Sequence, residues 1–387
     1  MHQGIAATAS GTAEYAAKHR ELIYRSFGNG GLVVSEAGFG GYRVDVSVAE
    51  HRLALEHALR SGINLIDTSA NYADGGSERL VGAVLTDMIK RGEIGREHVV
   101  VVTKAGYLQG ENMELSRQRK GEGAPFPDLV VFDAELEHCI HPVFLAEQLT
   151  RSLQRMQLTH IDCLLLHNPE YYLKWANHNN IDPEVAQTEY LRRIETAFRY
   201  LESEVKNGRI GCYGISSNTF PKPATDYERT DLSAILALAE EISQQHHFRV
   251  IEFPCNLFEP GAMVEENQPM NQTLIEFALD NQVTTLINRP LNAIQADQLI
   301  RLADNVYAGE AARQVADFRR RLAGIDPAWS ADTLSRLAIR ALRSTAGIGS
   351  VLVGMRRKEY VEDVLQELRE PCQISNRRQA WEMLAAM

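Results

Sequence analysis

Eight short apolar segments recur along the chain, and each is separated from the next by a longer segment with helical periodicity. The short segments have the length of strands, whereas the longer ones place apolar residues three or four positions apart, as an amphipathic helix does. The pattern therefore predicts parallel strands connected by helices. The predicted strands are 37–41, 63–67, 99–104, 161–167, 210–216, 250–256, 283–288 and 348–353; the predicted helices are 48–61, 78–90, 141–156, 184–207, 231–245, 272–281, 332–345 and 358–368.

A count of eight strands favours closure into a barrel. An open, doubly wound sheet would place a G-x-G-x-x-G turn between its first strand and first helix. The segment Gly38-Phe39-Gly40-Gly41 lacks that spacing and is not followed directly by a helix. We therefore predict an α/β fold, a (β/α)8 TIM barrel with long loops at the C-terminal face.

Three connections exceed the ordinary length, namely 106–140, 168–183 and 292–331, and the last is predicted to be partly helical. Each leaves the carboxyl end of a strand, which is the face where barrels build their sites. They are interpreted as substrate walls or a lid, with an insertion of no function or an oligomer contact as the alternative. Residues 1–30 are predicted to be a poorly packed or peripheral N-terminal extension, residues 31–370 the barrel and residues 371–387 a C-terminal tail.

Composition narrows the functional class. The net charge is −11 and the basic residues are scattered, which argues against nucleic-acid or membrane-surface binding. The five cysteines are odd in number and widely spaced, with no CxxC pair, which indicates a reducing compartment and no metal site. No signal peptide is evident at the N-terminus, and no apolar run approaches the ~18 residues that span a bilayer. We expect a cytoplasmic protein of undefined oligomeric state.

Three ionisable residues each close a predicted strand: Asp67, Lys104 and His167. A barrel would gather them on one rim, with Tyr72 on the loop beyond the second strand. A lysine at the end of an apolar strand needs a partner, and Asp67 is the natural one. The resulting ammonium is expected to lower the pKa of Tyr72 and make it a proton donor, while His167 orients the same substrate oxygen.

Each of these residues also has a purely structural interpretation. Asp67 is suited to capping, Lys104 to a charge on the rim, and His167 to a hydrogen-bonded core position. The four together, in the right strand order, favour a site.

The same residues belong to an ordered set of motifs. This set resembles the aldo-keto reductases over roughly residues 33–368, and its members are Asp67-Thr68-Ser69-Ala70-Asn71-Tyr72 with Gly76-Ser77-Glu78, Thr103-Lys104, Leu164-Leu165-Leu166-His167-Asn168-Pro169, Gly211-Cys212-Tyr213-Gly214-Ile215-Ser216 and Val351-Leu352-Val353-Gly354-Met355-Arg356.

The resemblance implies a TIM barrel that binds NADP(H) without a Rossmann domain. It also implies a catalytic tetrad, in which Tyr72 is the general acid in reduction, Lys104 tunes it, Asp67 holds Lys104, and His167 positions the carbonyl for hydride transfer. The expected activity is interconversion of an aldehyde, ketone or sugar carbonyl with its alcohol, so the expected partner is a small carbonyl or hydroxylated molecule.

The resemblance further implies a nicotinamide surface that differs from the family pattern. Ser216 matches the serine at the carboxamide, but Ser217 replaces the usual asparagine, Glu252 the usual glutamine and Asn288 the usual stacking aromatic. An ionised glutamate accepts hydrogen bonds but does not donate them. The predicted contacts on this surface are Ser216, Ser217, Glu252, Asn288, Arg289, Pro290 and Leu291.

The adenosine end of the cofactor is expected between the last strand and the final helix, near Gly354. A helix N-terminus with guanidinium groups suits phosphate, and Arg356 is predicted to bind the 2′-phosphate. A solvated basic turn is the alternative. Asp363 falls at the family's acidic adenine contact, although Val364 replaces the asparagine that usually follows.

Two further functions remain open from the sequence. The altered nicotinamide surface is compatible with a non-redox lyase or epimerase that retains its cofactor. A regulatory subunit that senses NADP(H) is the other alternative, although the intact tetrad argues against it.

Overall fold

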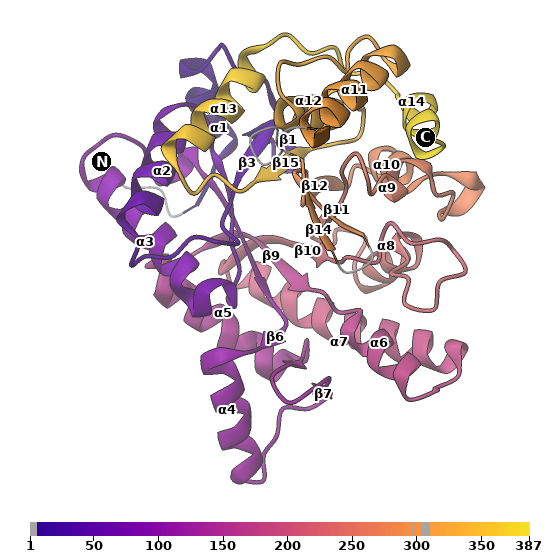
Figure 1. Ribbon diagram of the computed structural model, residues 1–387. Helices are drawn as coiled ribbons and strands as arrows, with labels where there is room; N and C mark the ends of the chain where they lie inside the picture. Colours follow the sequence, from indigo (N-terminus) through magenta and orange to yellow (C-terminus); the bar gives the residue numbers. More distant parts are fainter. Residues whose placement is uncertain (1–5, 296–297, 303–309) are drawn as a thin grey trace.

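The structure, a computed structural model, describes residues 6–295, 298–302 and 310–387. Its centre is a closed barrel of eight parallel strands, and helices surround the barrel (Figure 1). The strands follow in the order β10-β11-β12-β15-β3-β4-β5-β9, which confirms the predicted (β/α)8 fold. Their bounds are β3 Ala37–Gly40, β4 Leu65–Asp67, β5 Val100–Ala105, β9 Ile161–His167, β10 Ile210–Ser216, β11 Phe248–Pro254, β12 Thr284–Asn288 and β15 Ser350–Val353.

A helix follows every barrel strand, as predicted. The helices that cover the barrel are α2 Ala49–Arg60, α3 Gly76–Lys90, α5 Pro142–Met156, α7 Pro183–Lys206, α8 Leu232–Ile242, α10 Leu274–Asp280, α12 Leu334–Arg343 and α13 Lys358–Arg369. Gly62 follows α2 with φ +102° and Gly347 follows α12 with φ +90°. Both lie in the left-handed region that a helix terminus commonly uses, which explains the glycines there.

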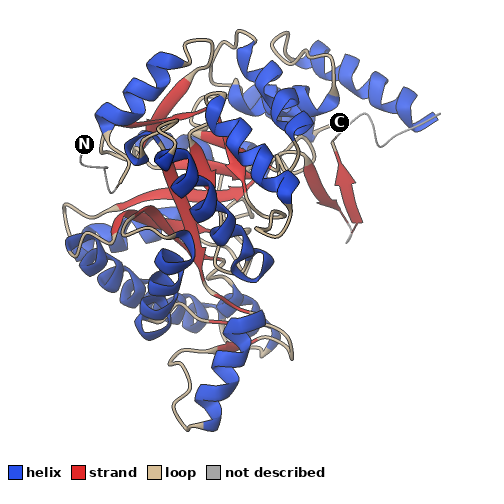
Figure 2. Ribbon diagram, turned by 90° about the vertical axis from the view of Figure 1, so that its left-hand side faces the viewer, coloured by secondary structure: helices blue, strands red, loops and turns tan. Residues whose placement is uncertain are grey.

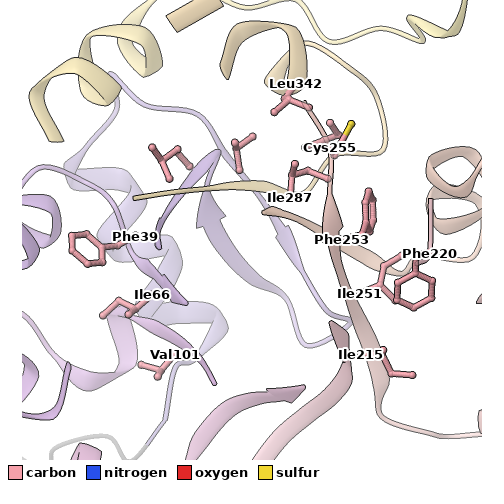
Figure 3. Close-up of a cluster of buried hydrophobic side chains, with 14 of the residues drawn as sticks. Phe39, Ile66, Val101, Ile215, Phe220, Ile251, Phe253, Cys255, Ile287 and Leu342 are labelled. Atoms are coloured by element: carbon pink, nitrogen blue, oxygen red, sulfur yellow. The ribbon is translucent and has the colours of Figure 1, made fainter. Parts of the chain in front are cut away.

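Alternate residues of each barrel strand face opposite sides. One set packs outward against the helices and includes Ile66, Val101, Ile251 and Phe253 (Figure 3). The other set fills the barrel lumen, with Leu65, Val100, Val102, Cys163, Leu165, Val250, Leu286 and Leu352 in one buried cluster. The lumen is therefore a packed core below the rim.

The N-terminal segment closes the amino end of the barrel. Strands β1 Tyr24–Phe27 and β2 Leu32–Ser35 form an antiparallel hairpin, and Phe27 and Val34 join the lumen cluster. Helix α1 Ala9–Lys18 packs beside them, and its Tyr15 is buried. The expected poor packing is therefore wrong for residues 6–30, while residues 1–5 lie outside the described residues. The apolar residues of this segment cover an end of the barrel that would otherwise be open.

The first two long connections fold into structures of their own. Residues 106–140 contain β6 Tyr107–Leu108, α4 Gly110–Gly121, β7 Val130–Val131 and β8 Glu137–His138, and these strands form a sheet in the order β6-β8-β7. This part projects from the barrel (Figures 1 and 2). Residues 168–183 contain helix α6 Tyr171–His178. Both segments leave the carboxyl ends of β5 and β9, as expected.

The third long connection, 292–331, is only partly described. It contains the hairpin β13 Asn292–Gln295 with β14 Gln298–Arg301, and helix α11 Glu310–Ile325, which agrees with the expected partial helicity. Residues 296–297 and 303–309 of this connection lie outside the described residues.

The C-terminal segment carries helix α14 Arg378–Ala385, which packs on α11 and on α9 Gly261–Val264. Its Trp381 is fully buried against Trp329. The division of the chain at residues 30 and 370 stays a prediction. Among the described residues, no helix is long and apolar enough to cross a membrane.

Candidate active site

Four barrel strands deliver the predicted site residues to one rim. Asp67 ends β4, His167 ends β9, and Lys104 is the penultimate residue of β5. Each of the three lies two positions beyond a lumen residue of its own strand, Leu65, Leu165 and Val102 respectively. Strand alternation therefore turns all three side chains into the mouth of the barrel. β11 adds Glu252 by the same rule, two positions after Val250.

Lys104 is fully buried and pairs with two carboxylates. Its Nζ lies 2.5 Å from Asp67 Oδ1 and 3.2 Å from Glu252 Oε2. Burial alone would lower the pKa of Lys104, but the two carboxylates outweigh it and raise this pKa above the ordinary value. Lys104 is therefore charged. Burial and the nearby Glu252 raise the pKa of Asp67, and Lys104 opposes that shift only in part.

The loop after β4 carries Tyr72 over this pair. The backbone N–H of Tyr72 donates to the Ser69 carbonyl. The backbone N–H of Ala70 donates to the Lys104 carbonyl, which ties the loop to β5. The Tyr72 hydroxyl lies 3.5 Å from Lys104 Nζ. The ammonium is also 5.1 Å from the ring centroid. The structure thus brings Asp67, Tyr72 and Lys104 together.

The expected lowering of the pKa of Tyr72 is wrong as a net effect. Lys104 does act in that direction, but burial of the phenol dominates, and the charges of Asp67 and Glu252 add to it, so this pKa is raised. The second carboxylate on Lys104 is part of the physical reason. Tyr72 is therefore a neutral phenol around neutral pH, the form that donates a proton.

His167 lies beside Tyr72, with a distance of 5.8 Å between the ring centroids. Burial, together with Lys104 and His138, lowers its pKa well below the usual range, so the imidazole is neutral. Its Nδ1 lies 2.9 Å from Ser69 Oγ. The single proton of the Ser69 hydroxyl points to Asn71 Oδ1, 2.7 Å away. When this hydroxyl donates to Nδ1 instead, the ring proton is on Nε2, where it can donate to a substrate oxygen.

Three predicted cofactor contacts meet on the other side of Lys104. Ser216 Oγ donates to Glu252 Oε1 at 3.1 Å, and Asn288 Nδ2 donates to the same oxygen at 2.9 Å. Asn288 Oδ1 is buried and has no hydrogen-bond partner in the described part of the chain, whereas Glu252 Oε2 is ion-paired with Lys104. Unsatisfied buried acceptors are costly, and the N–H groups of a carboxamide would satisfy them. The surface therefore fits a nicotinamide amide.

Other predicted contacts lie apart from this surface. Ser217 faces away from the lumen, with its hydroxyl bonded to Thr219 and Thr230. Arg289 adopts φ +53° and pairs with Glu259 at 3.1 Å. Pro290 is buried and Leu291 half-buried, and both follow directly on β12.

The predicted phosphate site lies between β15 and α13. Gly354 is exposed, and a Cβ added there would meet nothing within 4 Å. Arg356 is half-buried and has no ion-pair partner within residues 6–295, 298–302 and 310–387. This guanidinium fits a phosphate group. Asp363, by contrast, already accepts hydrogen bonds from Arg336 Nε and Ser335 Oγ, at 2.8 and 3.0 Å.

A group of aromatic side chains forms a wall beside His167, and the sequence analysis did not predict this wall. Tyr107, Tyr171, Phe132 and His138 come from the first two long connections, and each ring lies 4.6–5.7 Å from another ring of the set or from His167. Tyr42 lies against the other side of Tyr72, with 5.2 Å between ring centroids. The sequence does contain a signal for this wall, because several aromatic residues lie in the long loops after β5 and β9.

The chain is thus a (β/α)8 barrel that brings a buried lysine, a neutral phenol and a neutral imidazole together at its carboxyl rim. The family model of the "Aldo/keto reductase family" matches residues 36–252. The chain belongs to the aldo/keto reductase family.

Individual relatives are more distant. The chain is 28% identical over 166 residues to aldo-keto reductase AMT2 of Alternaria alternata, covering 40% of this chain and 44% of that protein. It is 27% identical over 206 residues to L-galactose dehydrogenase of Arabidopsis thaliana, covering 52% and 51%. The matches thus span about half the length of these relatives.

A solved structure supports the fold. The aldo/keto reductase from Klebsiella pneumoniae in complex with NADP and acetate superposes with a TM-score of 0.56 at 17% identity, over 94% of this chain and 95% of that one.

Proposed function

We propose that this protein is an NADP(H)-dependent oxidoreductase that interconverts a carbonyl compound and its alcohol. The observation that carries the proposal is the neutral phenol of Tyr72, 3.5 Å from the buried ammonium of Lys104. A phenol that keeps its proton in the resting site can give it to an alkoxide as that charge develops.

The residues divide the chemistry as follows. Asp67 fixes Lys104, and the ammonium stabilises negative charge on the Tyr72 oxygen once the proton has left. Neutral His167 donates a hydrogen bond from Nε2 to the substrate oxygen and so orients the carbonyl. The nicotinamide, when bound, supplies or accepts the hydride.

The cofactor would be held at both ends by residues that fit it. Ser216, Glu252 and Asn288 offer the polar groups for the carboxamide, and among the described residues Asn288 Oδ1 has no hydrogen-bond partner. Arg356 would bind the 2′-phosphate, which favours NADP(H) over NAD(H). The NADP complex of the Klebsiella pneumoniae relative supports this choice.

For the substrate we propose a hydroxylated carbonyl compound, sugar-like in character. Its support is the wall of Tyr107, Tyr171 and Phe132, because aromatic faces with polar neighbours suit amphipathic rings. The match to an L-galactose dehydrogenase agrees with it.

Absorbance near ~340 nm tests the activity, with NADPH and a panel of aldehydes, ketones and sugars. Tyr72→Phe keeps the ring and removes the proton donor, so kcat should fall by at least about 10²-fold. Tyr42→Phe is the matched control, since its hydroxyl is not part of the proton-transfer group, and it should retain kcat within a few-fold. A Tyr72→Phe variant as fast as the wild type would overturn the assignment, as would cofactor binding without turnover on any carbonyl.

A further inference from the structure

The buried rim holds more carboxyl groups than cations among the described residues. Asp67 and Glu252 both lie on Lys104, and within the described part of the chain Lys104 is the cation that pairs with either of them. His138 and His167 have lowered pKa values and contribute no positive charge around neutral pH. Two carboxylates therefore share one ammonium in a site largely closed to water.

The environment of Glu252 is rich in hydrogen-bond donors. Ser216 Oγ and Asn288 Nδ2 both donate to Oε1, while Oε2 lies 3.2 Å from the ammonium. Three donors thus face this carboxyl group, and its acceptor neighbour is the Asp67 carboxyl, whose pKa is raised by burial and then by Glu252. The side chain is 1% exposed, so water does little to screen it.

A cation would complete this arrangement. The oxidised nicotinamide ring carries a positive charge and the reduced ring carries none. Only the oxidised form of the cofactor would therefore add a second positive charge to the site. From the excess carboxylate we infer that Glu252 makes the site select the oxidised form of the cofactor over the reduced form. The inference rests on the proposed function, because it takes the surface of Ser216, Glu252 and Asn288 as the nicotinamide site.

The preference has a chemical consequence. Whatever stabilises the oxidised ring relative to the reduced one makes the bound reduced cofactor a stronger hydride donor. It also holds the oxidised product more tightly after carbonyl reduction. Glu252 would thus be a positioning residue that acts through charge, without a place in the proton-transfer step.

Equilibrium binding tests the inference apart from turnover. The dissociation constants of NADP⁺ and NADPH are measured separately by calorimetry on the full chain, for the wild type and for Glu252→Gln. The ratio Kd(NADPH)/Kd(NADP⁺) should fall at least about tenfold in the variant, since a unit charge acts strongly at short range in a poorly screened site. Tenfold corresponds to about 30 mV in the potential of the bound two-electron couple.

Two further variants separate charge from shape. Glu252→Asp keeps the negative charge on a shorter side chain and should keep most of the preference. Glu147→Gln removes a negative charge from the outer face of α5, where Glu147 pairs with Arg151, and should leave the ratio unchanged. An unchanged ratio in Glu252→Gln overturns the inference, and so does an equal loss in Glu252→Asp.

The proposed function is tested by the same proteins. If wild type binds both forms and oxidises NADPH with a carbonyl while the ratio is insensitive to Glu252, only the inference fails. If wild type binds neither form, the proposed function fails and the inference with it.

Discussion

Glu252 Oε2 lies 3.2 Å from Lys104 Nζ, although their strands β11 and β5 are separated by β9 and β10 around the barrel. The contact therefore crosses the mouth of the lumen. It joins Asp67, Tyr72 and Lys104, the proposed proton-transfer group, to the proposed nicotinamide surface.

Removal of the shared ammonium should destabilise the fold. Lys104→Met leaves Asp67 and Glu252 buried without their cation, and breaking a buried ion pair in this way costs about 3–5 kcal/mol in free energy of unfolding. The double variant Lys104→Met/Glu252→Gln should lose less, because one of the two unpaired carboxylates is gone. Urea unfolding measures both, and a double variant as unstable as the single one would contradict the shared pairing.

Protonation of His138 should destabilise the protein in acid. Burial lowers the pKa of His138 to about 4, from the ordinary histidine value of about 6.5. The folded state then binds fewer protons than the unfolded state between these pH values. The contribution of neutral His138 to the free energy of unfolding is fully present above about pH 6.5 and is lost as pH falls towards 4. Its maximum is about 3 kcal/mol.

A substitution isolates that contribution. His138 Nε2 lies 2.7 Å from the His167 carbonyl, and His138→Gln retains an N–H donor without a titrating ring. Its free energy of unfolding, measured in urea from pH 4.5 to 7, should vary less with pH than that of the wild type. Equal slopes would refute the prediction, and His178→Gln, which changes an exposed histidine, serves as the control.

Ser69 should set the proton position on His167. Its hydroxyl lies 2.9 Å from Nδ1, and Ser69→Ala leaves that buried nitrogen without this partner, at a cost of about 1–3 kcal/mol. The ¹⁵N resonances of His167 should indicate a single neutral tautomer in the wild type and a changed tautomer population in the variant. Ser350→Ala, a buried serine bonded to the Ser35 carbonyl, should leave them unchanged. Identical spectra for Ser69→Ala and wild type would remove Ser69 from this role.

Gly214 should be irreplaceable where β10 meets β11. A Cβ at this position would lie 1.8 Å from the Val250 carbonyl oxygen, and the strand register shifts between Tyr213 and Gly214. Gly214→Ala should therefore cost more than about 3 kcal/mol, or prevent folding, because backbone has to move. Gly121→Ala meets nothing within 4 Å and should unfold at the same temperature as the wild type or slightly above it. Thermal unfolding compares the two, and a stable Gly214→Ala would show that the strands can separate.

Strand ends explain how much of the site was predictable. The apolar runs before Asp67, Lys104 and His167 define both a strand and its last residues, and a parallel barrel brings such ends to one rim. Alternation along each strand then fixes which side chains face the lumen. By that rule Glu252 shares the side of Val250, whereas Ser217 follows the lumen residue Ser216 and faces outward.

Contacts between segments that are distant in the sequence were harder to predict. The pairing of Glu252 with Lys104 depends on side-chain reach across the barrel mouth, which no local pattern encodes. The net pKa of Tyr72 depends on how deeply the loop buries the phenol, and the sequence indicated only its charged neighbour. Likewise, Phe27 and Val34 lie outside the eight repeated strand and helix segments, and their burial follows from the barrel end that they cover.

The hairpin at the amino end of the barrel also bears on the order in which cofactor and substrate bind. Among the described residues, Phe27 and Val34 fill the amino end of the lumen, while Tyr72 lies at the opposite, carboxyl end. Substrate that stacks above a bound nicotinamide would block its exit. Under the proposed function, the cofactor would then have to bind first and leave last, so binding would be ordered.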